Sequence, residues 1–496
     1  MLIWLILTPA IASALIGLVR LPGRPVAILS AVISLALTLC AIFCTQCSSD
    51  CMSSFMGRDL QLTLDLPLSR VMILLTAIVT LAAAIGLRAP SADAARSWSI
   101  STLLISCGAT GAFLSDNIIA FYGFHELALI PTFVMIGLYG RADRRTIAWT
   151  ATLYLGAASM VLLAGILMLC SEMGSWTFSG MAEMVAQGVL PTSACAIGGL
   201  LLVGFGALVS LFPFHSWAAP AYASAPTPVA MMHAGVLKKF GLYGLFTIAA
   251  IFGPACTELF GCWNNWLLLC LLGNVLWVGF VTMNRSRLDD MLGNSSVMHM
   301  GYLFLAFAAY IGLGGNNELA FTGAALLMMA HGLSIAMLFL LTGQIEAQTK
   351  TLELDSMGGL GSKLPALGFL FGLAGMASIG LPLLANFPGE FSIFLSCFTG
   401  AELGQCSPSC CPFSYLGCLF GGVGPVQVAC IIALWGLVIG AVYMLRAFRK
   451  IFKGEVALAS VRATKLSCSD LISAAILAVA LVLFGCMPYI LVNLIG

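Results

Sequence analysis

The sequence predicts an all-α polytopic membrane protein of about fourteen transmembrane helices. Of its 496 residues, 60% are hydrophobic and only 8% are charged, whereas a soluble domain carries about 25% charged residues. Apolar runs of the length that spans a bilayer, about 20 residues, recur along the whole chain. A helix of that length satisfies its own backbone hydrogen bonds, whereas barrel strands would alternate polar and apolar residues over about ten positions.

Polar breaks between the apolar runs place the spans. The first, from Leu2 to about Val19, lacks a basic leading region and a small-residue cleavage site, so it is predicted to be a retained helix. The others are expected at about 26–45, 68–87, 99–115, 117–140, 146–170, 193–220, 227–252, 266–284, 295–313, 320–342, 364–400, 425–446 and 470–495. Spans seven and twelve are too long for one helix, which predicts breaks at Pro213 and at Pro382 and Pro388.

Lysine and arginine residues are distributed unevenly over the predicted loops. Of the 21, seventeen fall on one side of the membrane, Arg58 and Arg70 fall on the other, and Lys238 and Lys239 lie inside a span. Basic loops face the cytoplasm or matrix, so both termini are expected on the external side. The net charge of +1 gives no reason to expect a nucleic-acid partner.

Ionisable residues inside the predicted spans form the candidate site. A charge at the centre of a bilayer costs about 2.5–3.5 kcal/mol or more, which makes such residues functional candidates. Glu126 lies in FYGFHELALIPT, Lys238 and Lys239 lie in HAGVLKKFGLYG, and Glu390 lies in LANFPGEFSIF. All five histidines fall within spans or at a helix break: His125, His215, His233, His299 and His331.

These residue types suit a path for protons. Burial and neighbouring charges tune carboxylate, amine and imidazole groups so that each can accept and release a proton near neutral pH. Close packing explains a single helix histidine equally well, and Lys238 could extend toward the membrane surface. In a chain with so few charges, two acids, two lysines and five histidines favour a proton or cation path. No dinucleotide-binding glycine motif, cluster-type cysteine spacing or haem-type histidine pair predicts a redox site.

The motifs resemble those of chain 4 of NADH–quinone oxidoreductase (respiratory complex I), which is subunit M in bacteria. FYGFHELALIPTFVMIGLYG resembles its fifth helix, FPFHSWAAPAYASAPTP its HxWLPxAHxEAPT loop, and GVLKKFGLYG its GxLLKxGxYG helix. NSSVMHMGYLFL resembles SSxSHMG, MMAHGLSIAMLFLLTGQI resembles MIAHGLxxxxLF, and LPLLANFPGEFSIF resembles LPxxxNFxGEF. The resemblance is collinear from about residue 100 to 455, and HELALIPT with the AHG helix favours chain 4 over chains 2 and 5.

The resemblance implies two inverted five-helix repeats, each with a broken helix. The repeats cover 99–253 and 254–454, after an N-terminal three-helix segment (1–98) and before a last helix (455–496). It also implies a proton path along the middle of the membrane through Glu126, Lys239, His299, His331 and Glu390. His215, Pro213 and Pro388 match positions at the helix breaks.

The implied function is that of a core membrane-arm subunit of NADH:ubiquinone oxidoreductase, which conducts protons as electrons pass from NADH to quinone. NADH, FMN, iron–sulfur clusters and ubiquinone are expected elsewhere in the complex, with no cofactor or metal on this chain. Expected partners are other membrane-arm subunits, especially chains 2 and 5, and lipids such as cardiolipin. The alternatives are a subunit of a cation/proton antiporter and an arm subunit that no longer pumps. The divergent, cysteine-rich sequence favours a mitochondrial inner membrane over a plastid or bacterial one, with both termini toward the intermembrane space.

The chain departs from the family in the seventh helix. Leu208 occupies the position of the lysine that normally pairs with the fifth-helix glutamate, here Glu126, and no lysine occurs between Arg145 and Lys238. Three interpretations follow: Lys238, His125 or His233 substitutes for it, the path there uses water, or the subunit does not pump. We favour substitution, because His125 and Lys238 are additions to their motifs. A second departure lies in the loop before span ten, where Arg287 stands at the family's aspartate position and Asp289 at its lysine position. The two residues are predicted to form an ion pair of reversed polarity.

The chain holds eighteen cysteines. The topology places a set of them in or beside external loops, where an oxidising compartment would favour disulfides. Small apolar packing is the alternative role for cysteine, and a zinc site from Cys44, Cys47 and Cys51 lacks a fourth ligand. The external set is Cys44, Cys47, Cys51, Cys256, Cys262, Cys406, Cys410, Cys411 and Cys418.

Overall fold

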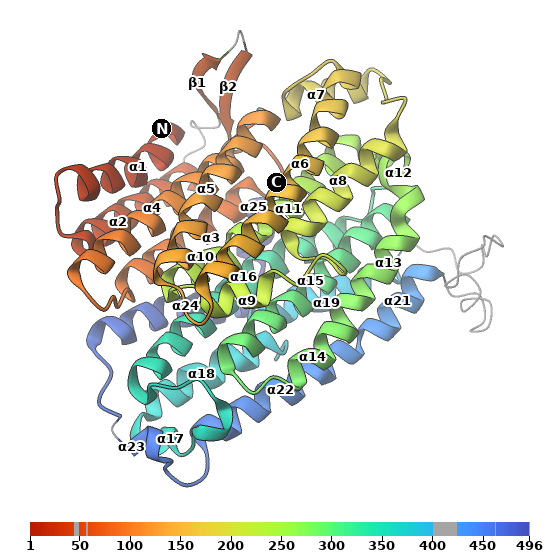
Figure 1. Ribbon diagram of the computed structural model, residues 1–496. Helices are drawn as coiled ribbons and strands as arrows, with labels where there is room; N and C mark the ends of the chain where they lie inside the picture. The colour runs from red at the N-terminus through yellow and green to blue at the C-terminus, as the bar shows by residue number, and fades with distance from the viewer. Residues whose placement is uncertain (44–48, 56–57, 400–423, 462, 496) are drawn as a thin grey trace.

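The computed structural model describes residues 1–43, 49–55, 58–399, 424–461 and 463–495. Helices lying roughly side by side form a single bundle (Figure 1). A short antiparallel hairpin of β1 (Ser49–Phe55) and β2 (Arg58–Thr63) projects from the end of the bundle where the N-terminus lies, with Ser49 opposite Thr63. Among the residues that the structure describes, this hairpin is the only sheet, and it lies outside the helical bundle.

The described residues account for fourteen apolar crossings. Nine helical stretches in the described chain are long and apolar enough to cross a membrane. One of them, Thr227–Met283, has 57 residues, far more than the about 20 that one crossing needs, and turns at residues 253–263 divide it in two. Four shorter apolar helices add to these ten: Leu2–Leu18, Ser69–Ile85, Ala194–Val209 and Pro365–Ser378. The predicted fold class is confirmed.

The first half of the chain supplies the helices drawn from red to yellow-green in Figure 1. In order they are α1 (Leu2–Leu18), α2 (Gly23–Phe43), α3 (Ser69–Ile85), α4 (Ala92–Leu114), α5 (Ile118–Tyr139), α6 (Arg144–Met173), α7 (Phe178–Ala186), α8 (Ala194–Val209), α9 (Ala218–Ser224), α10 (Thr227–Gly235), η1 (Leu237–Lys239) and α11 (Phe240–Phe252). N-cap side chains stabilise the first turns of two helices. Ser91 accepts a hydrogen bond from a main-chain N–H of α4, and Asn117 accepts hydrogen bonds from main-chain N–H groups of α5.

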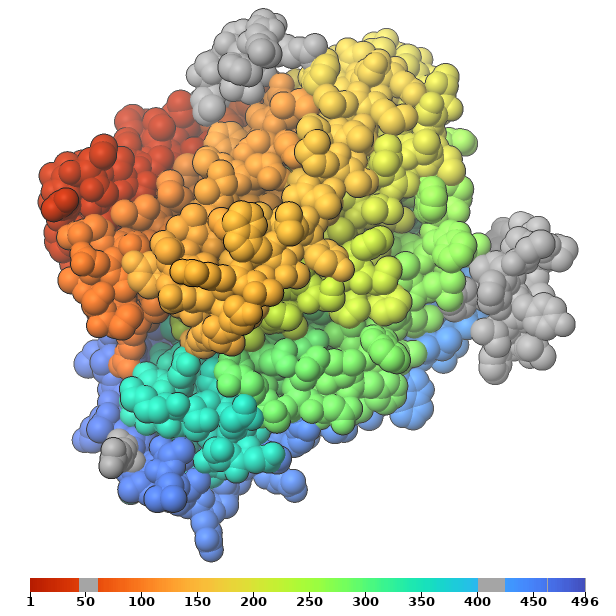
Figure 2. Space-filling view, in the orientation of Figure 1, coloured from red at the N-terminus to blue at the C-terminus, as the bar shows by residue number. Residues whose placement is uncertain are grey.

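The second half supplies the helices drawn from green to blue. They are η2 (Gly253–Ala255), α12 (Cys256–Phe260), η3 (Gly261–Trp263), α13 (Asn264–Leu272), η4 (Gly273–Val278), α14 (Gly279–Met283), α15 (Leu288–Gly312), α16 (Glu318–Thr349), η5 (Leu354–Ser356), α17 (Leu360–Lys363), α18 (Pro365–Ser378), α19 (Asn386–Ser396), α21 (Pro425–Ala433), α22 (Trp435–Phe452), α23 (Leu458–Val461), α24 (Cys468–Cys486) and α25 (Tyr489–Ile495). Helices of the first half cover the upper part of the face in Figure 2, and those of the second half cover the lower part.

Helices α15 and α16 form the centre of the bundle. Over their most apolar stretches, 94% of α15 and 100% of α16 is buried, against 33% for the peripheral α2. A buried helix can carry polar residues only if partners from its neighbours satisfy them. These two helices carry His299 and His331, so both histidines lie in the interior of the bundle.

Several crossings are interrupted, two of them as predicted. Span seven breaks between α8 and α9, and span twelve breaks between α18 and α19. Two further irregularities were not predicted: a 3₁₀ turn at Leu237–Lys239 divides span eight, and a π-helical segment at Gly273–Val278 lies within span nine. Such interruptions free backbone groups that must be satisfied by protein or by a cavity.

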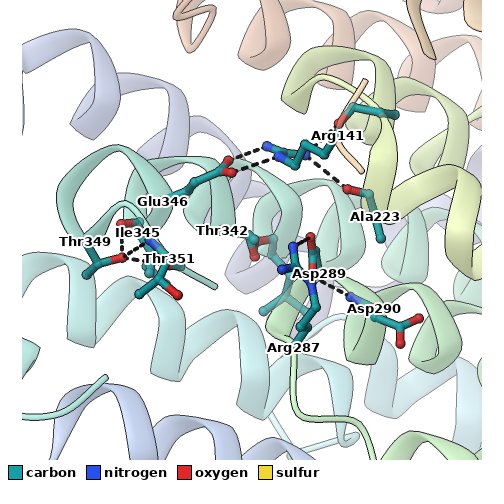
Figure 3. Close-up of polar contacts among 12 residues, drawn as sticks. Arg141, Ala223, Arg287, Asp289, Asp290, Thr342, Ile345, Glu346, Thr349 and Thr351 are labelled. Atoms are coloured by element: carbon teal, nitrogen blue, oxygen red, sulfur yellow. Dashed lines mark hydrogen bonds and ion pairs between the residues drawn. The ribbon is translucent and has the colours of Figure 1, made fainter. Parts of the chain in front are cut away.

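Ion pairs link the connections at the end of the bundle that holds the predicted basic loops. Arg88 pairs with Asp470, Arg141 with Glu346, Arg287 with Asp289 and Glu353, and Lys450 with Asp355. In Figure 3 the guanidinium of Arg141 meets the carboxylate of Glu346 and also donates to the carbonyl of Ala223. The predicted pair between Arg287 and Asp289 is present, at 2.8 Å. Paired charges therefore link several connections at this end of the bundle.

Within the described residues, one disulfide links helices at the opposite end. Cys195, at the start of α8, is bonded to Cys262, in η3. Cys262 belongs to the predicted external set, whereas Cys195 does not, and Cys256 of that set is a buried free thiol. Cys44, Cys47, Cys406, Cys410, Cys411 and Cys418, and the side chain of Cys51, lie outside the described residues.

Candidate functional site

Glu126 lies in the middle of α5 at the edge of a small cavity. Its carboxylate accepts a hydrogen bond from Ser159 of α6 and lies 3.6 Å from Nδ1 of His125. The side chain is 35% exposed, whereas that of His125 is 3% exposed. The cavity, of about 160 Å³, lies between α5 and α6 and is lined by Glu126, Thr132 and Thr152 among mainly apolar residues, with His233 also on its wall. Glu126 is therefore half-buried and accessible from this cavity.

The position of the absent lysine is filled by packing. Leu208, in α8, is 4% exposed and belongs to the main hydrophobic core. Of the three proposed substitutes, His125 contacts Glu126 directly and His233 shares its cavity. Lys238 instead donates to Ser296 of α15 at 3.3 Å, and its Nζ lies 5.2 Å from the ring centre of Tyr222. The geometry favours His125, and it directs Lys238 toward the second half of the chain.

Lys239 is joined directly to His331. The 3₁₀ turn places Lys239 Nζ 2.7 Å from the carbonyl oxygen of Ala234 and 2.9 Å from Nδ1 of His331. Both side chains are almost completely buried, at 0% and 2% exposed. An ammonium group has donors only, so a protonated Lys239 donates to Nδ1, and the proton of a neutral His331 is then on Nε2.

Two glycines allow this contact. Gly235 of α10 and Gly332 of α16 face each other where the two helices cross. A Cβ at Gly332 would lie 2.7 Å from the carbonyl oxygen of Gly235, a distance that real side chains do not tolerate. Small residues let helix backbones approach closely in membranes. The crossing therefore brings the segment that holds Lys239 next to the segment that holds His331.

His299 lies between His331 and the second helix break. Its ring centre lies 5.6 Å from that of His331. Its Nδ1 is 2.8 Å from the carbonyl oxygen of Ser295, and its Nε2 is 2.8 Å from that of Ser378, at the end of α18. Carbonyl oxygens only accept, so both bonds form together only when both ring nitrogens carry a proton. A neutral ring makes one of these two bonds, and a doubly protonated ring makes both.

Glu390 lies beyond the break in span twelve. It is in α19, is 3% exposed, and its Oε1 has no hydrogen-bond partner among the described residues. Asn386, one helical turn earlier, is also buried, and both of its amide atoms are likewise unpartnered within the described chain. Tyr302 connects this region to His299: its ring packs edge-on against the imidazole, with centres 5.9 Å apart. Glu390 is a buried acid at the far end of the Lys239–His331–His299 segment.

The predicted helix-break residues occupy different positions. Pro213 and His215 lie in the break between α8 and α9, and His215 lines a cleft of about 560 Å³ at the basic end together with Arg141, Arg287 and Asp289. Pro388 lies in the first turn of α19, after the break rather than in it. A proline is tolerated there because the first N–H groups of a helix have no partner within it.

Several residues of the site were not predicted from the sequence. Ser159, Ser295, Ser378 and Asn274 all contribute polar atoms to it. Ser295 and Ser378 both contribute main-chain carbonyls, so neither serine side chain is a sequence signal for its contact with His299. No group of three or more His, Cys, Asp or Glu side chains that could hold a metal ion occurs in the part of the chain that the structure describes.

Fourteen crossings, two broken helices and a buried row of ionisable side chains define a class of protein: the antiporter-like membrane subunits. The chain belongs to the NADH:quinone oxidoreductase/Mrp antiporter transmembrane family, whose model matches residues 115–404.

Named relatives are similar over most of the chain. It is 28% identical to NADH-quinone oxidoreductase subunit M of Rickettsia prowazekii over 424 residues, which cover 85% of this chain and 79% of the relative. It is 30% identical to NAD(P)H-quinone oxidoreductase chain 4 of Gloeobacter violaceus over 398 residues, 79% of this chain and 68% of that protein.

Two solved assemblies contain chains of the same fold. A chain of respiratory complex I from Thermus thermophilus superposes with a TM-score of 0.83 at 24% identity, covering 100% of this chain and 97% of that one. A chain of the Mrp complex from Dietzia superposes with a TM-score of 0.81 at 18% identity, covering 100% and 95%. At these identities the superpositions establish the fold alone.

Proposed function

We propose that this chain is the chain 4 (subunit M) component of the membrane arm of NADH:quinone oxidoreductase and conducts protons as quinone is reduced elsewhere in the complex. The observation that carries the proposal is the segment from Lys239 through His331 to His299, which connects two interrupted helices inside the bundle. Each of these groups can change its proton count near neutral pH.

The proposed order of events runs from Glu126 to Glu390. A proton enters from the basic end through the cavity at Glu126, where His125 and Ser159 support the carboxylate. Transfer through the buried lysines brings it to His331 and then to His299, whose two carbonyl contacts stabilise the doubly protonated ring. Glu390 accepts it for release on the external side. The chemical energy comes from redox reactions on other subunits, so we propose no cofactor site on this chain.

The proposal also specifies the boundaries of the two repeats, the partners of the chain and the membrane that holds it. The repeats would be 99–253 and 254–454, with the neighbouring antiporter-like chains 2 and 5 and anionic lipids such as cardiolipin as partners. The membrane would be the mitochondrial inner membrane, as the cysteine-rich composition suggests, with both termini toward the intermembrane space. The basic, ion-paired end of the bundle would then face the matrix.

A second candidate function is a subunit of a cation/proton antiporter, because the family to which the chain belongs also includes Mrp antiporter chains. The names of the relatives favour the quinone oxidoreductase. Purification through a tag on this chain tests the choice. We expect flavin and iron–sulfur subunits to co-purify, with NADH:quinone activity and proton uptake into vesicles that a protonophore abolishes. Sodium- or potassium-dependent proton exchange without NADH oxidation would instead establish the antiporter.

A further inference from the structure

A buried asparagine holds the first helix break against the helix of the central histidine. Asn274 is in span nine, within the π-helical segment Gly273–Val278, and is 0% exposed. Its Oδ1 accepts from the main-chain N–H of Phe212 at 2.6 Å. Its Nδ2 donates to the carbonyl oxygens of Ser210, at 3.0 Å, and Val297, at 2.9 Å. Both amide donors and the acceptor are therefore in use.

The three partners belong to two functional segments. Ser210 and Phe212 lie where α8 ends and the break in span seven begins, which leaves their backbone groups without helical partners. Val297 lies in α15 between Ser296, which accepts from Lys238, and His299. One side chain thus bonds both to the break in the first half of the chain and to the helix that carries two contacts of the proposed proton path.

The packing around Asn274 leaves little freedom for these contacts. A Cβ at Gly301 of α15 would lie 3.2 Å from Cβ of Asn274 and 3.0 Å from the carbonyl oxygen of Leu271, so the two helices touch backbone to side chain. The ring of Phe212 packs directly against Gly273 from the other side. A π-helical segment is rare, and such segments occur frequently at functional sites. Here it turns the Asn274 amide toward both partners at once.

We infer that Asn274 is a positioning residue that couples movement of the break in span seven to the position of Ser296 and His299. If the Ser210–Phe212 turn moves, either its two hydrogen bonds to Asn274 break or the Asn274 amide moves with it. The hydrogen bond from Asn274 to Val297 then transmits that change to α15. Polar networks of this kind act as a unit inside a low-dielectric interior. The inference rests on the proposed function, because it concerns how proton transfer in the two halves is linked.

Asn274→Leu tests it, because leucine has a similar size and removes all three hydrogen bonds. In the intact complex reconstituted into vesicles, we expect the proton-to-electron ratio to fall and coupled proton transfer to decrease by about twofold to thirtyfold, the range for residues that link sites.

Asn274→Asp adds a readout that packing alone would not produce. A protonated aspartic acid regains one hydrogen-bond donor. The proton-to-electron ratio of the Asn274→Asp complex is therefore expected to recover as the pH is lowered. Asn284→Leu, in the same span, is the matched control, because Asn284 is exposed and bonds only the carbonyl of Phe280 in its own helix.

Measuring Lys239→Met in parallel separates the two proposals. If Lys239→Met lowers the ratio while both Asn274 variants retain it with no pH dependence, the coupling role is wrong and the proposed function stands. If Lys239→Met retains the ratio, the proposed function itself is wrong. Hydrogen exchange in the unmodified complex checks the geometry even if the variants do not assemble. The amide of Phe212 should exchange as slowly as those of α8, and fast exchange there would overturn the inference.

Discussion

Glu126 has 35% of its side chain exposed, whereas Lys239, His299, His331 and Glu390 are each 3% exposed or less. Both regions place ionisable groups in spans, but they satisfy them differently. Glu126 relies on one histidine, one serine and an adjoining cavity. The second region relies on a direct amine–imidazole bond and on backbone carbonyls at interrupted helices.

The difference follows from the residue that occupies the seventh-helix position. Leu208 offers no charge, so a closed, dry site at Glu126 would leave a carboxylate without a cation, which is costly inside a membrane. An accessible cavity and the neighbouring His125 relieve that cost. In the second region Lys239, His331 and His299 each lie within hydrogen-bond distance of a neighbour, whereas Glu390 Oε1 has no partner among the described residues. On the proposed function, the cavity beside Glu126 is where water would take the place of the missing cation.

The largest expected effect is from Lys239→Met. Methionine fills a similar volume but removes the donor to Ala234 and His331, which interrupts the buried segment at its start. We expect coupled proton transfer to fall by more than about tenfold, comparable to the loss of a positioned acid–base group. Proton uptake by vesicles during NADH oxidation measures it. Lys453→Met, at an exposed lysine after α22, is the control, and an equal loss in that variant would show that the effect is not specific to the path.

Glu126→Gln should have a smaller effect, a decrease of about threefold to tenfold, because the cavity lets other groups or water transfer protons around the missing carboxylate. The same vesicle assay gives the comparison. A loss as large as that of Lys239→Met would show that the region around Glu126 is no more open to alternative proton transfer than the region from Lys239 to Glu390.

The role of His125 can be tested with a rescue. His125→Leu removes the group 3.6 Å from Glu126 and should lower proton transfer by about twofold to fivefold, less than removing Glu126 itself. Leu208→Lys in the same background restores a cation at the seventh-helix position and should recover the loss. If His125→Leu has no effect on proton transfer, His125 does not support Glu126.

Gly332→Ala probes the crossing that joins the two regions. The added methyl group would meet the carbonyl of Gly235 at 2.7 Å, and overpacking of this kind costs about 1–3 kcal/mol. We expect a lower melting temperature of the complex and weaker proton transfer. Gly314→Ala is not a suitable control, because Gly314 has a positive φ, whereas Gly156→Ala in α6 meets no atom within 4 Å. Equal melting temperatures for the two variants would contradict a close crossing at Gly332.

The smallest expected effect is at the basic end of the bundle. The ammonium of Lys450 donates a hydrogen bond to Asp355 and lowers the pKa of that carboxyl below its usual value. A lowered pKa in the folded state contributes stability that is present above the unfolded pKa, about 3.9 for aspartate, and lost as the pH falls through the folded value. Thermal melting from neutral to acidic pH should show that Lys450→Met removes this small contribution, and an unchanged profile would mean that the exposed pair is energetically neutral.

The sequence was sufficient for the spans and for most of the ionisable residues, because charges are so rare in this chain that each one inside a span is informative. It was also sufficient for the breaks in spans seven and twelve, where prolines interrupt overlong apolar runs. It was not sufficient for the 3₁₀ turn at Leu237–Lys239 or the π-helical segment at Gly273–Val278, because neither contains a proline. The role of Asn274 depends on main-chain groups of Ser210 and Val297 that come together only in the folded bundle.

The central claim is that the buried segment from Lys239 to Glu390 carries protons. The proton-to-electron ratio of the complex with Glu390→Gln tests it most directly, since glutamine keeps the shape of the side chain and removes its ability to release a proton. We predict a fully assembled complex that oxidises NADH with a lower ratio than the unmodified complex. An assembled complex with an unchanged proton-to-electron ratio would contradict proton transfer through Glu390.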